Sequence, residues 1–469
     1  MNDIARMFEP KSIAIVGASS NPFAMANVNF LNPLLEFGYK GKVYPVNRTA
    51  GEIAGLRAYA SIRDIPGPVD YVICAVPASA TPELMRECVA AKVKTVAIFT
   101  AGFSETGEEE GMRLERQLVE IARQGGVRML GPNCLGVHCP AAGLSLDAYI
   151  PKESGHVGFL SQSGGNAQDT VLGLAERAVY ISKLASFGNA ADLNESDILE
   201  YLVGDDDTRI IGAYIEGIKQ PVRFLRAARA AVDAGKPVIV LKGGKSDAGG
   251  GAVRLHTGAL AGSKETWDAV CRQAGIIQVG SLKELADTIQ AFHYLKTLRG
   301  RRVGIVGVGG GANVLAADDC ESAGLVVPPL PAEIRQRLRE FTPLPGTGLR
   351  NPVDTLTDIY LDPPMLARTF EIVAGWEGFD IMLVVFPTLL GVRLGVEHLS
   401  AAIEAVTGVA KGLDKPVAMV LRSANFADGD RVACEMLQQG IEAGLPVFWS
   451  FAEAARAVDR VVSYYQDGR

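Results

Sequence analysis

The chain has 469 residues, of which 48% are hydrophobic and 21% charged, a composition typical of globular rather than disordered proteins. At about 150 residues a domain, this length predicts three domains. The formal net charge is −7 and no long basic block occurs, so we expect no nucleic-acid partner. Acidic Asp3 and Glu9 stand near the start, and no apolar run approaches about 18 residues, which predicts neither a signal peptide nor a membrane span.

The seven cysteines include no Cys-x-x-Cys pair, and they predict reduced thiols in a cytoplasmic protein. Cys134 and Cys139 flank His138. Three such groups in one turn, without a fourth ligand, make a poor zinc site, and we expect no metal site in this chain.

Short β-branched runs alternate with Ala-, Leu-, Glu- and Arg-rich stretches of helical period, which predicts an α/β fold with parallel sheets. In the first domain, residues 1–145, the predicted strands are 12–17, 42–46, 71–76, 95–99 and 128–130. In the second, residues 146–298, they are 156–160, 181–186, 210–216, 237–242 and 276–280. In the third, residues 299–469, they are 302–308, 380–386, 416–421 and 446–450, with a Pro- and Gly-rich loop at 341–348.

The strand ends of the first domain carry turn sequences, and ligands of open parallel sheets bind beyond the carboxyl ends of the strands. These turns contain Gly17-Ala18-Ser19-Ser20, Val46-Asn47-Arg48, Val76-Pro77, Gly102-Phe103 and Gly131-Pro132-Asn133. The first turn lacks two glycines of the Gly-x-Gly-x-x-Gly pattern, so a nucleotide-like ligand is favoured over a dinucleotide. With Arg48 as a phosphate cation, the turns predict a site for an extended phosphorylated molecule. An ordinary strand-helix turn capped by serines is the alternative.

The second domain contains the candidate catalytic residues. His256 lies among small residues in His256-Thr257-Gly258-Ala259-Leu260-Ala261-Gly262, which leaves its ring accessible for group transfer, although an uncommitted loop histidine is the alternative. A strand is followed by Ser161-Gln162-Ser163-Gly164-Gly165, where a helix over 166–177 offers hydroxyl and N–H groups to an anion, or is simply a capped helix.

Three further side chains stand near these segments. Glu216 ends a predicted strand, where a carboxylate could fix the tautomer of an imidazole or form no specific contact. Lys242 and Lys245 precede the histidine segment and either steady a phosphate or, as we slightly favour, only solvate the loop.

In the third domain, Gly307-Val308-Gly309-Gly310-Gly311-Ala312 superficially matches a dinucleotide-binding pattern. The acids that follow, Asp318, Asp319 and Glu321, come too early and on a predicted helix, whereas a ribose-binding acid ends the second strand. The pattern therefore does not favour a dehydrogenase.

Four motifs, in this order along the chain, resemble the α-type subunit of the NDP-forming acyl-CoA synthetases, which include ADP-forming acetate-CoA ligases and succinyl-CoA synthetase. They are Gly17-Ala18-Ser19, Tyr44-Pro45-Val46-Asn47, Gly131-Pro132-Asn133-Cys134-Leu135-Gly136 and the histidine segment 256–262. The resemblance implies three doubly wound domains, a Rossmann-like CoA-binding domain followed by two flavodoxin-like domains, the last with the family's loop at Asn351-Pro352-Val353-Asp354.

The resemblance also implies roles for the candidate residues. His256 would be phosphorylated, Glu216 would be its partner, and Ser161, Gln162, Ser163, Gly164 and Gly165 would hold the phosphoryl group. Coenzyme A would contact Gly17, Ser19, Ser20, Val46, Asn47, Arg48, Val76, Pro77, Gly102, Phe103 and Asn133. Val253-Arg254-Leu255 departs from the small residues common before the family's histidine, which puts the turnover rate or the partner in doubt.

These implications predict an acid-thiol ligase in which a phosphoryl group passes from ATP or GTP to His256 and then to an unidentified small carboxylic acid, before coenzyme A takes the acyl group. No Gly-x-x-x-x-Gly-Lys-Ser/Thr motif occurs, and an ATP-grasp domain needs about 200 residues. We therefore expect ATP or ADP and Mg²⁺ on a separate ATP-grasp β-type subunit of a hetero-oligomer. The alternatives are a CoA-binding regulatory protein without turnover and an NAD(P)-binding dehydrogenase.

Overall fold

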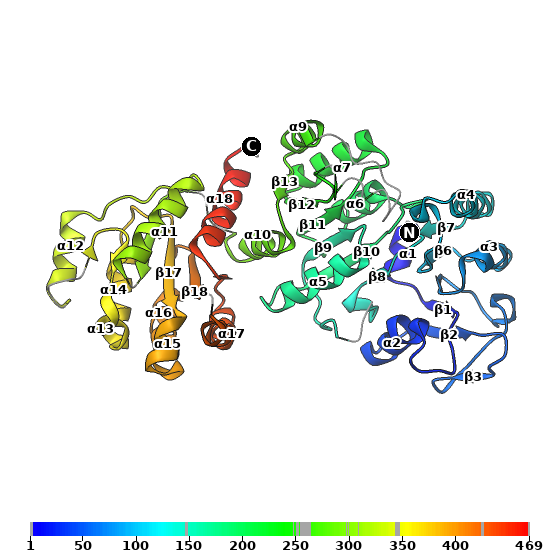
Figure 1. The fold of residues 1–469 in the computed structure, drawn as a ribbon, viewed down its shortest axis with the longest axis horizontal. Coiled ribbons are helices and arrows are strands. Elements are labelled where there is room, and N and C mark those ends of the chain that lie inside the picture. The colour runs from blue at the N-terminus through cyan, green and yellow to red at the C-terminus, as the bar shows by residue number, and fades with distance from the viewer. Residues whose placement is uncertain are drawn as a thin grey trace. The chain divides into compact units, whose positions relative to one another are not determined.

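The computed structural model describes residues 3–145, 149–246, 248–249, 253, 264–296, 298, 300–307, 309–342, 348–423 and 426–467. The chain divides into two compact units, Met1–Leu285 and Ala286–Arg469. Strands and helices alternate along both units (Figure 1). In the described part of the chain, no helix combines the length and the apolar character that crossing a membrane requires.

The first sheet is parallel, with strand order β2-β1-β5-β6-β7. Its strands are β1 (Ser12–Val16), β2 (Lys42–Val46), β5 (Tyr71–Cys74), β6 (Thr95–Ile98) and β7 (Arg128–Leu130). Helix α1 (Asp3–Phe8) precedes the first strand. The connections contain the helices α2 (Asn32–Phe37), α3 (Thr81–Ala90) and α4 (Glu109–Gln124), and the short hairpin β3 (Glu52–Ile53) and β4 (Leu56–Arg57). Burial of β1, β5 and β6 along their whole lengths is expected of a parallel sheet covered on both faces.

The second sheet lies in the same unit, with strand order β13-β12-β11-β9-β10-β8. Its parallel strands are β9 (Val157–Ser161), β10 (Ile181–Ser186), β11 (Ile210–Ile215), β12 (Val238–Lys242) and β13 (Ile277–Val279), and β8 (Gly136–His138) is antiparallel to β10. Its helices are α5 (Gly164–Ala175), α6 (Glu195–Val203), α7 (Pro221–Asp233) and α9 (Lys264–Ala274). Helix α10 (Leu282–Tyr294) begins in this unit and continues into the second. One hydrophobic core joins both sheets, and Phe8 stacks on Tyr201 with ring centroids 5.1 Å apart.

The third sheet belongs to the second unit and has the order β15-β16-β14-β17-β18-β19. Its strands are β14 (Val303–Gly307), β15 (Gly348–Leu349), β16 (Val353–Asp354), β17 (Ile381–Pro387), β18 (Val417–Arg422) and β19 (Val447–Phe448). Its helices are α11 (Gly310–Ser322), α12 (Ala332–Arg339), α13 (Leu356–Tyr360), α14 (Pro363–Ala374), α15 (Thr388–Leu394), α16 (Val396–Ala410), α17 (Ala427–Glu442) and α18 (Phe451–Asp467).

The three sheets share one topology. In each, the second parallel strand lies on one side of the first, and the chain then crosses to the other side, so the strand order reverses beside β1, β9 and β14. A crevice opens at such a switch point, outside the carboxyl ends of the strands. The topology therefore points to the β1–β5, β9–β11 and β14–β17 edges as places for ligands.

The predicted α/β fold class is confirmed, and every predicted strand is present with ends shifted by at most two residues. The structure adds β3, β4, β8, β15 and β16, which are too short to produce a periodic pattern. Most of the predicted loop at 341–348 lies outside the described residues. The division into three domains at 145/146 and 298/299 stays a prediction. β8, from the residues before the first of these boundaries, belongs to the second sheet.

Candidate functional site

A cavity of about 490 Å³ opens at the carboxyl ends of β1, β2 and β5, the switch point of the first sheet. Six of the predicted coenzyme A contacts line it: Gly17, Val46, Asn47, Arg48, Val76 and Pro77. Gly17 has φ of +102°, and a Cβ atom there would lie 2.6 Å from the Ala75 carbonyl oxygen. Only glycine lets the backbone run this close to Ala75, the residue that follows β5, so glycine sets the shape of the turn beside the cavity.

Asn47 organises the floor of this cavity. Its Nδ2 donates to the Ala18 carbonyl at 2.8 Å, and its Oδ1 accepts from the backbone N–H groups of Thr49 at 2.9 Å and Ala50 at 3.0 Å. The side chain ties the turn after β2 to the turn after β1. Arg48, by contrast, is exposed and lines the cavity, where a cation can meet a phosphate.

The other predicted contacts, Ser19, Ser20, Gly102, Phe103 and Asn133, do not line this cavity. The Ser19 N–H donates to Asn27 Oδ1 at 3.0 Å, which holds the turn after β1 to the buried Asn27. No sequence pattern indicated that Ser79, Glu83 and Glu87 line the cavity. Glu83 and Glu87 come from α3, and they add carboxylates to a lining that also contains Arg48.

The second sheet presents a different kind of edge. β9 pairs with β11, so the turn that follows Ser161 lies beside the end of β11 at Ile215. The fully buried Ser161 donates through Oγ to the Ser163 carbonyl at 2.6 Å and accepts from the Ser163 N–H at 3.2 Å. Its hydroxyl therefore shapes the turn.

Helix α5 begins directly after this turn. Ser163 is its N-cap, with Oγ accepting from the Asn166 N–H at 3.3 Å. The first N–H groups of a helix have no partner within it, so those of Gly164 and Gly165 stand at the same edge and favour an anion. A Cβ on Gly164 would lie 2.6 Å from Leu135 Cγ, so glycine is needed for this packing, whereas Gly165 has open space.

Gln162 joins the two strands. It is 2% exposed, and its Oε1 accepts from the backbone N–H of Gly217 at 2.9 Å and from that of Glu216. The backbone N–H of Gln162 donates to the Tyr214 carbonyl at 3.1 Å. Among the described residues, its buried Nε2 has no hydrogen-bond partner. Buried N–H groups are nearly always hydrogen-bonded, so this amide suits a ligand oxygen or water.

Glu216 follows β11 and is 2% exposed. Its Oε1 accepts from the Tyr214 hydroxyl at 3.0 Å. Burial raises the pKa of Tyr214, and the Glu216 carboxylate raises it further, so the phenol keeps its proton and remains a donor. The Glu216 side chain is thereby oriented by a residue of the preceding strand.

The two lysines have structural partners. Lys242 is 7% exposed and donates to the carbonyls of Glu216 at 2.6 Å and Gly243 at 2.5 Å. Burial lowers its pKa. Lys245 donates to the Val279 carbonyl at 3.2 Å. Lys242 thus supports the backbone that holds Glu216, and it does not solvate the loop as we slightly favoured from the sequence. His256, with the residues from 254 to 263, lies outside the described residues.

The structure explains two further segments that the sequence brought forward, the glycine turn after β14 and the segment that contains His138. In the third sheet, Asp354 ends β16 and its Oδ1 accepts from the N–H groups of Gly309 at 3.0 Å and Leu356 at 3.2 Å, so this acid organises the glycine turn. Asp318, Asp319 and Glu321 lie within α11, as predicted. His138 is buried in β8, and burial lowers its pKa to about 3, which makes the ring neutral at physiological pH.

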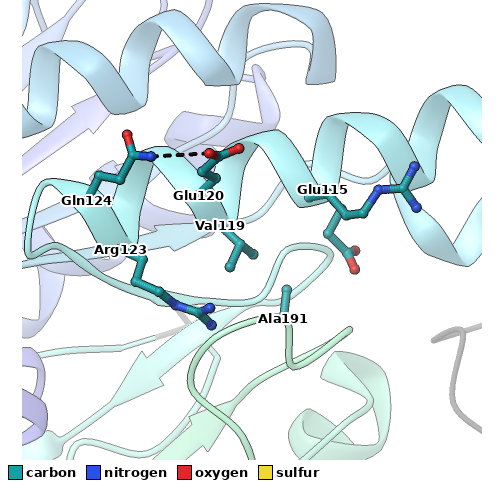
Figure 2. Close-up of a pocket in the computed structure, with 7 residues that line it drawn as sticks. Glu115, Val119, Glu120, Arg123, Gln124 and Ala191 are labelled. Atoms are coloured by element: carbon teal, nitrogen blue, oxygen red, sulfur yellow. Dashed lines mark hydrogen bonds between the residues drawn. The ribbon is translucent and has the colours of Figure 1, made fainter.

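A larger hollow, of about 680 Å³, lies along α4, and none of the residues that line it is a predicted site residue. Figure 2 shows Val119 and Arg123 extending from α4 toward the segment with Ala191, with Glu120 and Gln124 hydrogen-bonded to each other on the same helix. Its lining is mostly mixed charge, from Glu115, Arg116, Glu120 and Arg123. Its size alone therefore does not make it the functional site.

Comparisons with known proteins assign a family to the segments that contain these two edges. Residues 11–140 match the family model described as CoA binding domain, and residues 154–292 match the succinyl-CoA ligase like flavodoxin domain. The chain is 37% identical over 462 residues to the ADP-forming acetate-CoA ligase II subunit alpha of Pyrococcus furiosus, covering 97% of this chain and 96% of that one.

Two further comparisons differ in extent. The chain is 35% identical over 460 residues to ADP-forming acetate-CoA ligase I of Archaeoglobus fulgidus, and covers 63% of that longer chain. The structure of acetyl-coenzyme A synthetase 1 from Ca. Korarchaeum cryptofilum, in complex with phosphate and ADP, superposes with a TM-score of 0.84 at 29% identity, covering 100% of this chain and 98% of that one. These names favour a ligase over a regulatory protein or a dehydrogenase.

Proposed function

The chain belongs to the family of NDP-forming acyl-CoA synthetases, acid-thiol ligases, as an α-type subunit, and from this we propose that it carries the phosphoryl group on His256 during acyl-CoA synthesis. The observation that supports this most directly is the buried Gln162–Glu216 cluster at the β9–β11 switch point, inside the segment matched by the succinyl-CoA ligase domain.

The proposed reaction has three balanced steps. A ring nitrogen of His256 attacks the γ-phosphorus of ATP or GTP, a P–N bond forms, and the nucleoside diphosphate leaves. A carboxylate oxygen of the acid then attacks phosphorus, the P–N bond breaks, and an acyl phosphate forms. The thiolate of coenzyme A attacks the acyl carbon, the C–O bond to phosphate breaks, and inorganic phosphate leaves. Covalent intermediates divide one difficult step into easier ones.

The residues of the second sheet have distinct parts in this proposal. Glu216, held by Tyr214, would accept a hydrogen bond from one ring nitrogen of His256 and favour the other nitrogen as the nucleophile. The N–H groups of Gly164 and Gly165 and the buried Nε2 of Gln162 would bind phosphoryl oxygens. Positioning and neutralisation of charge at phosphorus supply most of the rate enhancement in such transfers.

Coenzyme A would bind from the cavity of the first sheet. Gly17 gives its backbone access, Arg48 meets a phosphate, and the cavity falls within the 300–1,000 Å³ range that is about usual for small-molecule sites. We assign the nucleotide and its Mg²⁺, which neutralises phosphate charge, to an ATP-grasp β-type subunit in a hetero-oligomer. The relative from Pyrococcus furiosus is itself named as a subunit alpha.

Labelling tests the proposal. With γ-labelled ATP and the β-type partner, the wild-type chain should acquire an acid-labile, base-stable phosphate that His256→Asn lacks. His156→Asn, which changes an exposed histidine of the same unit, should keep the label. Label on His256→Asn, or none on the wild type, contradicts the proposal. Calorimetric titration should show binding of coenzyme A, and binding of NADH alone would support a dehydrogenase. A panel of acids assayed for thiol consumption, with ATP and with GTP, then identifies the substrates.

A further inference from the structure

Asn189 links the two strand-end edges of the first unit. It lies three residues after β10 and is fully buried. Its Nδ2 donates to Glu105 Oε2 at 2.6 Å and to Glu115 Oε2 at 2.9 Å, and Ser104 Oγ lies 3.3 Å away. One carboxamide nitrogen of the second sheet therefore serves two carboxylates of the first-sheet region.

Glu105 connects Asn189 to the turn after β6 through hydrogen bonds. It is 8% exposed, and its Oε1 accepts from the backbone N–H groups of Gly102 at 2.6 Å and Phe103 at 3.1 Å. Gly102 has φ of +108°. Glycine adopts positive and negative φ about equally readily, so a further contact is needed to hold this turn in one conformation. The carboxylate holds this turn in place, and its burial is compensated only while each oxygen has donors.

The backbone around Asn189 also contacts two further turns, the segment 131–133 and the Ser161–Ser163 turn. Its N–H donates to the Pro132 carbonyl at 3.0 Å, which fixes the segment 131–133. Two residues earlier, the Phe187 N–H donates to the Ser161 carbonyl at 2.9 Å, at the start of the Ser161–Ser163 turn. A Cβ on Gly188 would collide with the Asn133 carbonyl oxygen, so the segment 187–189 is packed tightly between these turns.

We propose that Asn189 is a positioning residue. It holds the Gly102–Phe103 turn, which the family resemblance implies as a coenzyme A contact outside the cavity, in register with the Ser161–Ser163 turn, so that the thiol of coenzyme A meets the acyl phosphate. This inference rests on the proposed function. A carboxamide suits the place because its two N–H groups match two carboxylates without adding charge. Aspartate would bring a third carboxylate, and alanine would leave a buried Glu105 oxygen without its donor.

The test separates the two half-reactions, with Asn189→Ala as the main variant. Phosphorylation of His256 by ATP and the β-type partner should stay within about twofold of wild type, because the Asn189 side chain donates to Glu105 and Glu115 rather than to Gln162 or Glu216. The KM for coenzyme A should rise about tenfold, as for a lost hydrogen bond to a charged group. Thioester formation from the phosphorylated chain should slow by a similar factor.

Asn194→Ala is the matched control. Asn194 is equally a buried asparagine of this unit, but its side chain accepts from the Ser196 N–H at 2.9 Å and caps α6. It should lower stability without changing the KM for coenzyme A. If Asn189→Ala does not fold, Glu105→Gln tests the same link from its acceptor side, with the same expected rise in KM.

The outcomes are distinct. An unchanged KM and thioester rate in folded Asn189→Ala, or equal changes in Asn194→Ala, overturn the positioning role while leaving the proposed function standing. Absence of label and of coenzyme A binding in the wild-type chain overturns the proposed function itself. A rise in KM with normal labelling, reproduced by Glu105→Gln and not by Asn194→Ala, supports the role.

Discussion

The first and second sheets have the same strand order at their switch points but finish their edges differently. At the first edge, Gly17 and the turns around it leave a cavity of about 490 Å³. At the second, Gln162, Glu216 and Lys242 fill the space with buried, mutually hydrogen-bonded groups. An open edge can admit a large ligand, whereas a filled edge fixes a few polar atoms where charge develops.

The difference between the two edges explains why the same topology can hold a substrate at one edge and a reacting group at the other. The turn beside the cavity depends on the absence of a side chain at Gly17, and the polar cluster depends on the presence of particular side chains. Substitutions should therefore affect the edges in opposite ways. Added bulk should damage the first edge, and removed or altered polarity should damage the second.

The largest effect is expected at Glu216, because the buried carboxylate would orient and charge-stabilise the histidine. Glu216→Gln keeps the size and an acceptor for the Tyr214 hydroxyl, and should reduce the rate of His256 phosphorylation by roughly 10³-fold. Coenzyme A binding, measured by calorimetry, should be unchanged. The control Tyr214→Phe removes the donor but keeps the charge, and should cost far less. Equal losses in the two variants would mean that orientation, not charge, is the main contribution.

Gly17→Ala should damage the first edge alone. A left-handed φ costs an alanine roughly 1–2 kcal/mol, and the 2.6 Å contact with the Ala75 carbonyl forces the turn to shift, so coenzyme A binding should weaken about 10²-fold. Phosphorylation of His256 should continue at the wild-type rate.

Gly38→Ala provides the comparison for Gly17. Gly38 has φ of +75°, and apart from its neighbours along the chain no atom lies within 4 Å of the position that an alanine Cβ would take, so the substitution brings the backbone strain without the contact. It should lower the free energy of unfolding, measured with urea, and leave coenzyme A affinity unchanged. A similar loss of affinity in both variants would show that general destabilisation, rather than the cavity, is responsible.

Strands and strand-end turns were predictable because buried parallel strands read as short β-branched runs and the turns follow them directly. Six of the predicted coenzyme A contacts line the cavity for that reason. Ser19 was harder to place, since its N–H is taken up by Asn27, eight residues later, in a turn whose shape the sequence does not reveal.

Contacts between elements could not be predicted in the same way. Gln162 bridges to Glu216 only because β9 pairs with β11, and Glu83 reaches the cavity only because α3 lies beside it. Asn189 and Glu105 are separated by 84 residues. No periodicity in either segment signals that a carboxamide and a carboxylate will meet, because the meeting depends on how two sheets share one core.

Gln162 tests whether the second edge needs a donor as well as an acceptor. Gln162→Glu keeps oxygens for the N–H groups of Glu216 and Gly217 but replaces the buried Nε2 with a negative oxygen, which repels phosphate. Phosphorylation should fall about tenfold or more. Gln162→Leu should also lower the free energy of unfolding by roughly 1–3 kcal/mol, because two buried N–H groups lose their acceptor. A Gln162→Glu variant with normal labelling would remove the donor role.

The smallest effect concerns neither edge but the strand that follows the first sheet and joins the second. His138 in β8 has its pKa lowered from 6.5 to about 3 by burial. Between these values the unfolded chain binds a proton that the folded chain does not, so stability is retained above pH 6.5 and falls as the pH decreases below it. The contribution should approach about 1.4 kcal/mol per pH unit.

Urea unfolding of His138→Leu between pH 7 and 5 should show a shallower decline than wild type. His156→Leu, which alters an exposed histidine, should decline as the wild type does. Parallel curves for all three chains would mean that the folded protein protonates His138, so that β8 opens readily at the junction of the two sheets.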